Sequence, residues 1–116
     1  MATIAAAQVT RKDNGNIVVL WETLDGTTNT TGAPFTAPAG YRLAAVHFIG
    51  TFGAAVTMQG SIDGANFGIA EDVASVAVSA TAAAWFNVQG DAVAWKPVAA
   101  SGVSDVDVLA LFTPRG

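Results

Sequence analysis

The stretch from Val56 to Phe67 constrains the fold more than any other part of the sequence. Apolar Val56 and Met58 alternate with polar residues, which is the period of a strand with one buried face. Gly60 follows, and then Asp63-Gly64, a pair that favours tight turns because both residues tolerate left-handed backbone angles. The stretch therefore predicts a strand, a compact structural turn at Gly60, Asp63 and Gly64, and a return of the chain.

Short apolar runs separated by turn residues lie on both sides of this stretch. Ile17 to Leu24 is rich in β-branched residues, and its first half is apolar at every position, as in a strand covered on both faces. Asp105 to Phe112 alternates, with Leu109 and Leu111 on the face opposite Phe112. We predict an all-β protein: an antiparallel, jelly-roll-like β-sandwich of eight or nine short strands without a significant helix.

The segment from Leu43 to Ile62 carries no charged residue over twenty positions, a length that would allow a membrane-spanning helix. It contains His47 and three glycines, however, and its second half alternates. We interpret it as two strands and expect no membrane partner. The first strand, Tyr41 to Gly50, is predicted to place Leu43, Ala45, His47 and Ile49 on one face.

The 116 residues are expected to form a single domain, 1–116. The Ala-rich segment 1–10 is predicted to be an edge strand or an N-terminal arm. Residues 25–40 hold five Thr, three Gly and two Pro without a hydrophobic period, which predicts a long irregular loop that Phe35 attaches to the body. Long loops of this kind often carry contacts with partners.

Charged residues make up only 12% of the chain, against 52% apolar ones, where an average soluble domain has roughly 25% charged residues. Fourteen charged side chains cover the surface of a small domain thinly. We expect much of this surface to be buried against other subunits; a neutral surface on a monomer is the alternative. The expected partner or oligomer interface residues are Ile4, Val9, Phe35, Trp95, Leu109 and Leu111.

The charge balance and the residue types argue against several other functions. A net charge of −4 opposes nucleic-acid binding, which needs clustered Lys and Arg. The chain has no Cys, so it has no thiolate chemistry and no Cys-based metal site. His47 is the single histidine, and no nucleophile motif accompanies it. We expect no catalytic residue, no cofactor and no metal, and therefore no enzyme activity.

Three carboxylates are candidate metal ligands: Asp63, Asp105 and Asp107. Asp105 and Asp107 share one strand face, but no calcium-loop spacing surrounds them. They are predicted to be solvent-facing and to discourage edge pairing. Asp63 is predicted to bond its own backbone.

Trp21, Trp85 and Trp95 are three large rings in a small chain. They are predicted to lie in the core or at a subunit interface. The alternative is an exposed platform on which a sugar ring stacks.

The segment from Met58 to Phe67 resembles the Gly-Ser-x-Asp-Gly turn with a following aromatic residue that occurs in small β-sandwich proteins of tailed-phage virions. Phe67 stands where this turn often has Trp. The segment Ala92 to Val98, a strand with Lys96 before Pro97, is similar to the next landmark, and the resemblance spans residues 41–113. It implies a head decoration (cement) protein or a tail or fibre-attachment module, and it implies no catalytic residues.

Two functions are therefore expected. The first is a structural virion protein, a capsid decoration protein that forms a homotrimer and bridges neighbouring copies of the major capsid protein, or another virion protein. It would be made in the host cytoplasm and located on the phage particle. The alternative is a carbohydrate-binding or tail/fibre-attachment module that uses exposed Trp or Tyr41.

Overall fold

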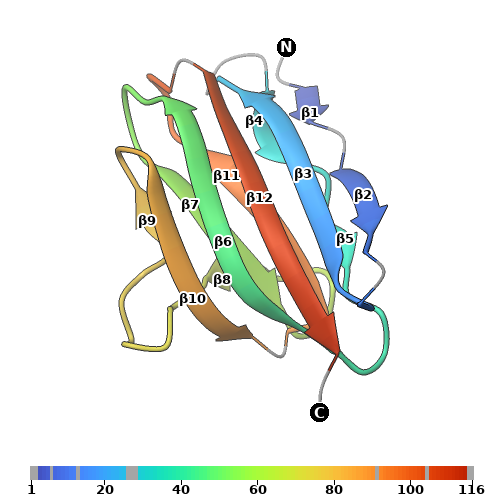
Figure 1. The fold of residues 1–116 in the computed structure, drawn as a ribbon. Helices are drawn as coiled ribbons and strands as arrows, with labels where there is room; N and C mark the ends of the chain where they lie inside the picture. The colour runs from blue at the N-terminus through green and yellow to red at the C-terminus, as the bar shows by residue number, and fades with distance from the viewer. Residues whose placement is uncertain are drawn as a thin grey trace.

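The structure of the chain is a computed structural model that describes residues 3–5, 7–12, 14–25, 29–90, 92–103 and 105–114. These residues form twelve strands and no helix. The strands assemble into two sheets that pack face to face, so the predicted β-sandwich is confirmed (Figure 1).

The front layer of Figure 1 is a five-stranded sheet in the order β10-β6-β12-β3-β2. All four pairings in it are antiparallel. The central strand β12 pairs with β6 on one side and with β3 on the other. The strands are β2 (Ala7–Arg11), β3 (Ile17–Leu24), β6 (Tyr41–Thr51), β10 (Ala84–Gly90) and β12 (Asp105–Pro114).

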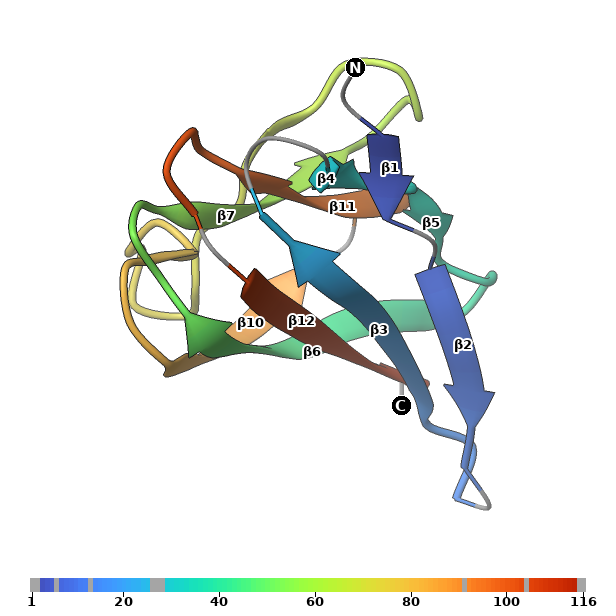
Figure 2. The ribbon, with the colours of Figure 1, turned by 90° about the horizontal axis from the view of Figure 1, so that it is seen from above.

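The second layer is a seven-stranded sheet, which the view from above separates from the first (Figure 2). Its main path is β1-β4-β11-β7-β8, and the short strands β5 and β9 pair with β11 and β7. The pairing of β1 with β4 is parallel and the others are antiparallel. The strands are β1 (Thr3–Ala5), β4 (Asn29–Gly32), β5 (Phe35–Thr36), β7 (Val56–Ser61), β8 (Gly68–Ile69), β9 (Ser79–Ala80) and β11 (Ala94–Ala99).

The core lies between the two sheets and is built from the inward positions of both. On β3 these positions are Ile17, Val19 and Trp21, which are at most 1% exposed. On β12 every second residue from Val106 to Phe112 is fully buried. The alternation predicted for both strands is thus confirmed, because each strand presents one face to the facing sheet.

A bulge in β6 changes the face assignment that the sequence predicted. Ala45 pairs with Leu111 and Leu43 pairs with Phe112, so Ala44 is an extra residue without a partner on β12. An extra residue in one strand shifts the alternation by one position. Leu43 therefore turns into the core, fully buried, whereas Ala45 and His47 stay on the outer face. The prediction that Leu43 shares a face with these two residues is wrong.

Two segments hold more strand than the sequence indicated. Residues 25–40, predicted to be an irregular loop, contain β4 and β5, which pair with β11. In the N-terminal segment, predicted to be one edge strand or an arm, Thr3–Ala5 and Ala7–Arg11 form two strands, β1 and β2, each paired in a different sheet. These short strands raise the number above the eight or nine expected.

Candidate interaction surface

The turn after β7 is closed by its own side chains. The Asp63 carboxylate accepts hydrogen bonds from the Ser61 hydroxyl at 2.8 Å, from the backbone N–H groups of Ala65 and Asn66 at 2.8 Å, and from the Asn66 side chain at 2.7 Å. These bonds favour the ionised form, and the bond from the Asn66 N–H contributes most, so the pKa of Asp63 lies well below its ordinary value. Asp63 thus organises the turn, as the sequence predicted.

Glycine is required at two positions in this turn, for a different physical reason at each. Gly64 has a φ of 81°, a left-handed angle that side chains disfavour. Gly60 lies in β7, where a Cβ atom would approach the Trp95 ring to 2.8 Å. Gly60 is therefore needed for close packing and Gly64 for the backbone angle.

The expected interface residues do not lie together. Trp95 is 3% exposed and packs in the core, so its assignment to an interface is wrong. The large ring fits inside because it faces glycine: a Cβ atom on Gly90 would meet it at 2.4 Å. Phe35 is half-buried against Phe112, with ring centroids 5.0 Å apart.

The remaining expected residues lie on different parts of the surface. Val9 is 46% exposed on the edge strand β2. Ile4 belongs to β1, but its side chain is outside the described residues. Only Leu109 and Leu111 share a surface, as neighbours on the outward positions of β12. This surface is the outer face of the five-stranded sheet.

The centre of that outer face is apolar across four strands, as the register of the sheet shows. One row across the sheet is Trp85, His47, Leu109 and Leu20, and the next is Asn87, Ala45, Leu111 and Val18. Neither row contains a charged residue. We define these eight residues as the outer apolar face.

The outer apolar face is hollowed beside Trp85. A depression of about 200 Å³ is lined by side chains from β3, β6, β10 and β12. The lining residues are Val18, Ala45, His47, Trp85, Leu109, Ala110 and Leu111.

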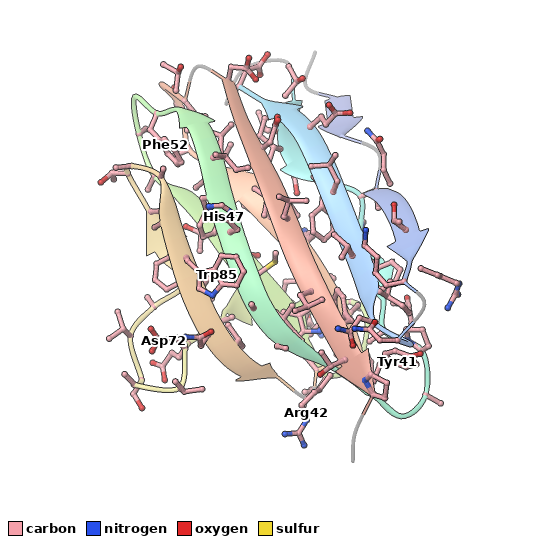
Figure 3. All side chains as sticks on the ribbon, in the orientation of Figure 1. Tyr41, Arg42, His47, Phe52, Asp72 and Trp85 are labelled. Atoms are coloured by element: carbon pink, nitrogen blue, oxygen red, sulfur yellow. The ribbon has the colours of Figure 1, made fainter. Side chains whose placement is uncertain are left out.

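Trp85 stands at one side of this hollow and is 58% exposed. Figure 3 shows its ring and the His47 imidazole side by side on the near side of β10 and β6. Their centroids are 5.2 Å apart, and the Trp85 N–H donates to the Asn87 side chain at 3.1 Å. The Trp85 indole thus contacts both His47 and Asn87, and these contacts fix it as a projection from the face. The sequence placed Trp85 in the core or at an interface, and the alternation of Trp85 with Phe86 did not reveal which of the two points outward.

A second depression, of about 350 Å³, lies where β7 and β8 approach the end of β10. Gly60, Gly90 and Trp95 are among its lining residues, with the carboxylate-bearing Glu71 at its side. The Trp95 Nε1 atom is buried and has no hydrogen-bond partner among the described residues. Ser61 is also a buried polar residue of this lining, but its hydroxyl donates a hydrogen bond to Asp63 in the turn.

Asp105, at the start of β12, is exposed, whereas Asp107 has a structural role. The Thr23 N–H donates to the Asp107 carboxylate at 3.0 Å. Thr23 has a φ of 59° and lies at an irregularity in the pairing of β3 with β12. Asp107 therefore fixes a bulge. Within the described part of the chain, no group of three His, Asp or Glu residues could hold a metal ion.

No helix within the described ranges has the length and hydropathy needed to cross a membrane. The uncharged segment from Leu43 to Ile62 is instead divided between β6 and β7, as the sequence predicted.

Comparison with known proteins identifies no family. No protein-family model matches the sequence. No curated protein matches it significantly. A cupin-2 domain containing protein from Shewanella frigidimarina is 12% identical with a TM-score of 0.43, and the alignment covers 99% of this chain and 85% of that one. A protein from the disulfide-linked pili of Bacillus endospore appendages is 11% identical with a TM-score of 0.46. The alignment covers 100% of this chain and 96% of that one. These comparisons assign no function to the chain, so its function has to be argued from its own surface.

Proposed function

We propose that the chain is a structural subunit that assembles with copies of itself, and that it acts as a decoration protein on the head of a tailed bacteriophage. The observation that supports this function is the outer apolar face, which lies open on the described structure. The sparse charge of the chain and the resemblance of its Asp63 turn to virion proteins agree with it. The resemblance adds a place on the particle surface to this proposal.

The mechanism of such a protein is physical and needs no catalysis. A rigid oligomer that straddles neighbouring capsid subunits touches several of them at once. After one contact forms, the others form at a high effective concentration, so weak contacts give tight binding together. The capsid then opens only when all of these contacts break.

The test is the mass of the purified protein by light scattering after size exclusion, followed by cosedimentation with heads of the phage that encodes it. We expect an oligomer of the 11.7 kDa chain that sediments with heads and raises the temperature at which they open. A chain that neither self-associates nor sediments with heads would refute the function.

A second candidate is a carbohydrate-binding module, because Trp85 offers an exposed ring beside the hydrogen-bonding groups of Asn87 and His47. Trp21 and Trp95 are buried, so a sugar that stacks on Trp85 would change the emission of one exposed indole. A titration with a panel of soluble oligosaccharides tests this function. We expect no saturable change if the chain is a decoration protein, and a saturable change that Trp85→Ala abolishes would favour the carbohydrate module.

A further inference from the structure

We propose that the outer apolar face is covered by the same face of a second copy, so that Trp85 of each chain enters the hollow of the other. This inference rests on the proposed self-association and names the surface that carries it. Four observations support it: the pattern of the strands, the area of the outer side of the sheet, the shape of the face and its chemistry.

The strand pattern indicates that the sheet is covered on both sides. Strands with one solvated face alternate between apolar and polar residues, whereas strands buried on both faces are apolar throughout. Residues 17–21 of β3 and 108–112 of β12 are apolar at every position. The seven-stranded sheet covers only their inward side chains. Val18, Leu109 and Leu111 therefore have the character of core residues without a covering layer.

The whole outer side of the five-stranded sheet, which comprises the outer apolar face and the residues around it, has sufficient area for a specific dimer. Its five strands average about eight residues. At about 4.8 Å between strands and about 3.3 Å per residue, the sheet offers roughly 600 Å². A standard interface buries roughly 600 to 1,000 Å² on each partner. One whole face from each copy therefore meets the lower limit of this range.

The shape of the face is complementary to itself. A twofold axis places residue i of one copy against residue j of the other, and j against i. The face carries a projection, Trp85, directly beside a hollow of about 200 Å³. This volume equals roughly seven waters of about 30 Å³ each, which is room for a ring side chain. One twofold operation thus fills both hollows.

The chemistry of the face fits this occupant. Charged residues are depleted at the centres of interfaces, where aromatic residues are enriched. The two central rows have no charge, and Trp85 and His47 are their rings. Polar and charged residues lie around them, such as Glu22 and Asp107 on β3 and β12. This arrangement is the apolar centre and polar rim of a protein–protein contact.

The test compares Trp85→Ser with Val76→Ser by light scattering from 1 to 500 μM. Val76 is a suitable control because it is 54% exposed and lies outside both sheets. We expect the wild-type protein and Val76→Ser to approach twice 11.7 kDa, and Trp85→Ser to need at least tenfold more protein to associate. Equal weakening by both substitutions, or by neither, would overturn the inference.

Fluorescence gives a measurement that does not depend on a variant. Trp85 is the exposed indole and the other two are buried, so acrylamide quenching reports mainly on Trp85. We expect quenching of the wild-type protein to fall as association proceeds. Quenching that stays constant while the mass doubles would place the contact on another surface and refute the inference.

The remaining outcomes separate this inference from the proposed function. The wild-type protein could stay monomeric and still sediment with heads, while Trp85→Ser no longer does. This outcome shows that the face docks on the capsid. That result overturns the face-to-face pair and retains the decoration function. A trimer whose mass Trp85→Ser leaves unchanged also overturns the pair.

Discussion

At the centre of the five-stranded sheet, β3 and β12 carry apolar residues on both the inner and the outer face, but only the inner face is covered. Inward Trp21 and Phe112 are fully buried by the facing sheet, whereas outward Leu109 and Leu111 remain partly exposed. The same alternation of residues thus serves two purposes. Apolar side chains on the inner face stabilise the fold of one chain, and those on the outer face are available for contacts between chains. Substitutions on the two faces should accordingly change different measured quantities.

The largest effect is expected on the inner face, from Phe112→Ala. The ring is fully buried and packs against Phe35 at 5.0 Å between centroids. Removal of a buried aromatic ring leaves a cavity and destabilises a protein by about 3–5 kcal/mol. Urea denaturation of the dilute protein should show this loss in the free energy of unfolding. A loss under about 1 kcal/mol would mean that Phe112 is not part of a close-packed core.

The next effect concerns the other wall of the same core, at Gly32 of β4. A Cβ atom there would lie 2.5 Å from the Trp21 ring and 2.6 Å from Pro97, both buried. Gly32→Ala should therefore reduce the free energy of unfolding by about 1–3 kcal/mol through overpacking. Gly68→Ala is the matched control, since nothing lies within 4 Å of its added Cβ atom. Equal stability of the two variants in urea would contradict this packing.

On the outer face, Leu109→Thr should change association more than folding. Thr is β-branched and therefore suits a strand, and the site is only half-buried. We expect the unfolding free energy of the monomer to change by less than about 1 kcal/mol. The wild-type thermal midpoint should rise with protein concentration, because association stabilises the folded state. The midpoint of Leu109→Thr should not rise, and an equal rise would show that the face is not used.

The smallest effect lies outside both faces, at Asp63 in the exposed turn. Its pKa is lower in the folded protein than its ordinary value of 3.8. The ionised carboxylate therefore stabilises the fold above about pH 4, and this contribution is lost as the pH falls toward the folded pKa. Between pH 5 and pH 2, the urea midpoint of the wild-type protein should fall more than that of Asp63→Asn. Parallel curves would show that the turn does not depend on this charge.

The features that could be predicted from the sequence are those that depend on residues close together in the chain. The β-sandwich, the buried alternation of β3 and β12 and the Asp63 turn follow from local period and turn chemistry. The bulge at Ala44 could not be predicted because it depends on how β6 pairs with β12. These two strands lie far apart in the chain, so no local pattern shows their register. The sequence allowed Trp95 either a core or an interface position and could not decide between them, since the glycines that face its ring lie on two other strands.

The candidate surface was predicted only in part. Leu109 and Leu111 were selected from alternation alone, which showed that they oppose the buried face of their strand. Val18, Ala45 and Trp85 lie beside them because β3, β6 and β10 belong to the same sheet as β12. The order of the strands in this sheet cannot be read from the sequence. The continuous apolar run in β3 was the available signal for a second covered face.

The position of β12 at the centre of the five-stranded sheet has a consequence for synthesis. Until the ribosome has released residues 105–114, β6 with β10 and β3 with β2 are two separate ribbons with no strand to join them. A two-stranded ribbon is marginally stable in water, so the core cannot close before β12 is available. Chains that stop before β12 would lack both the core and the outer face. The strand order thus excludes truncated chains from assembly, because only chains that include all of β12 can fold.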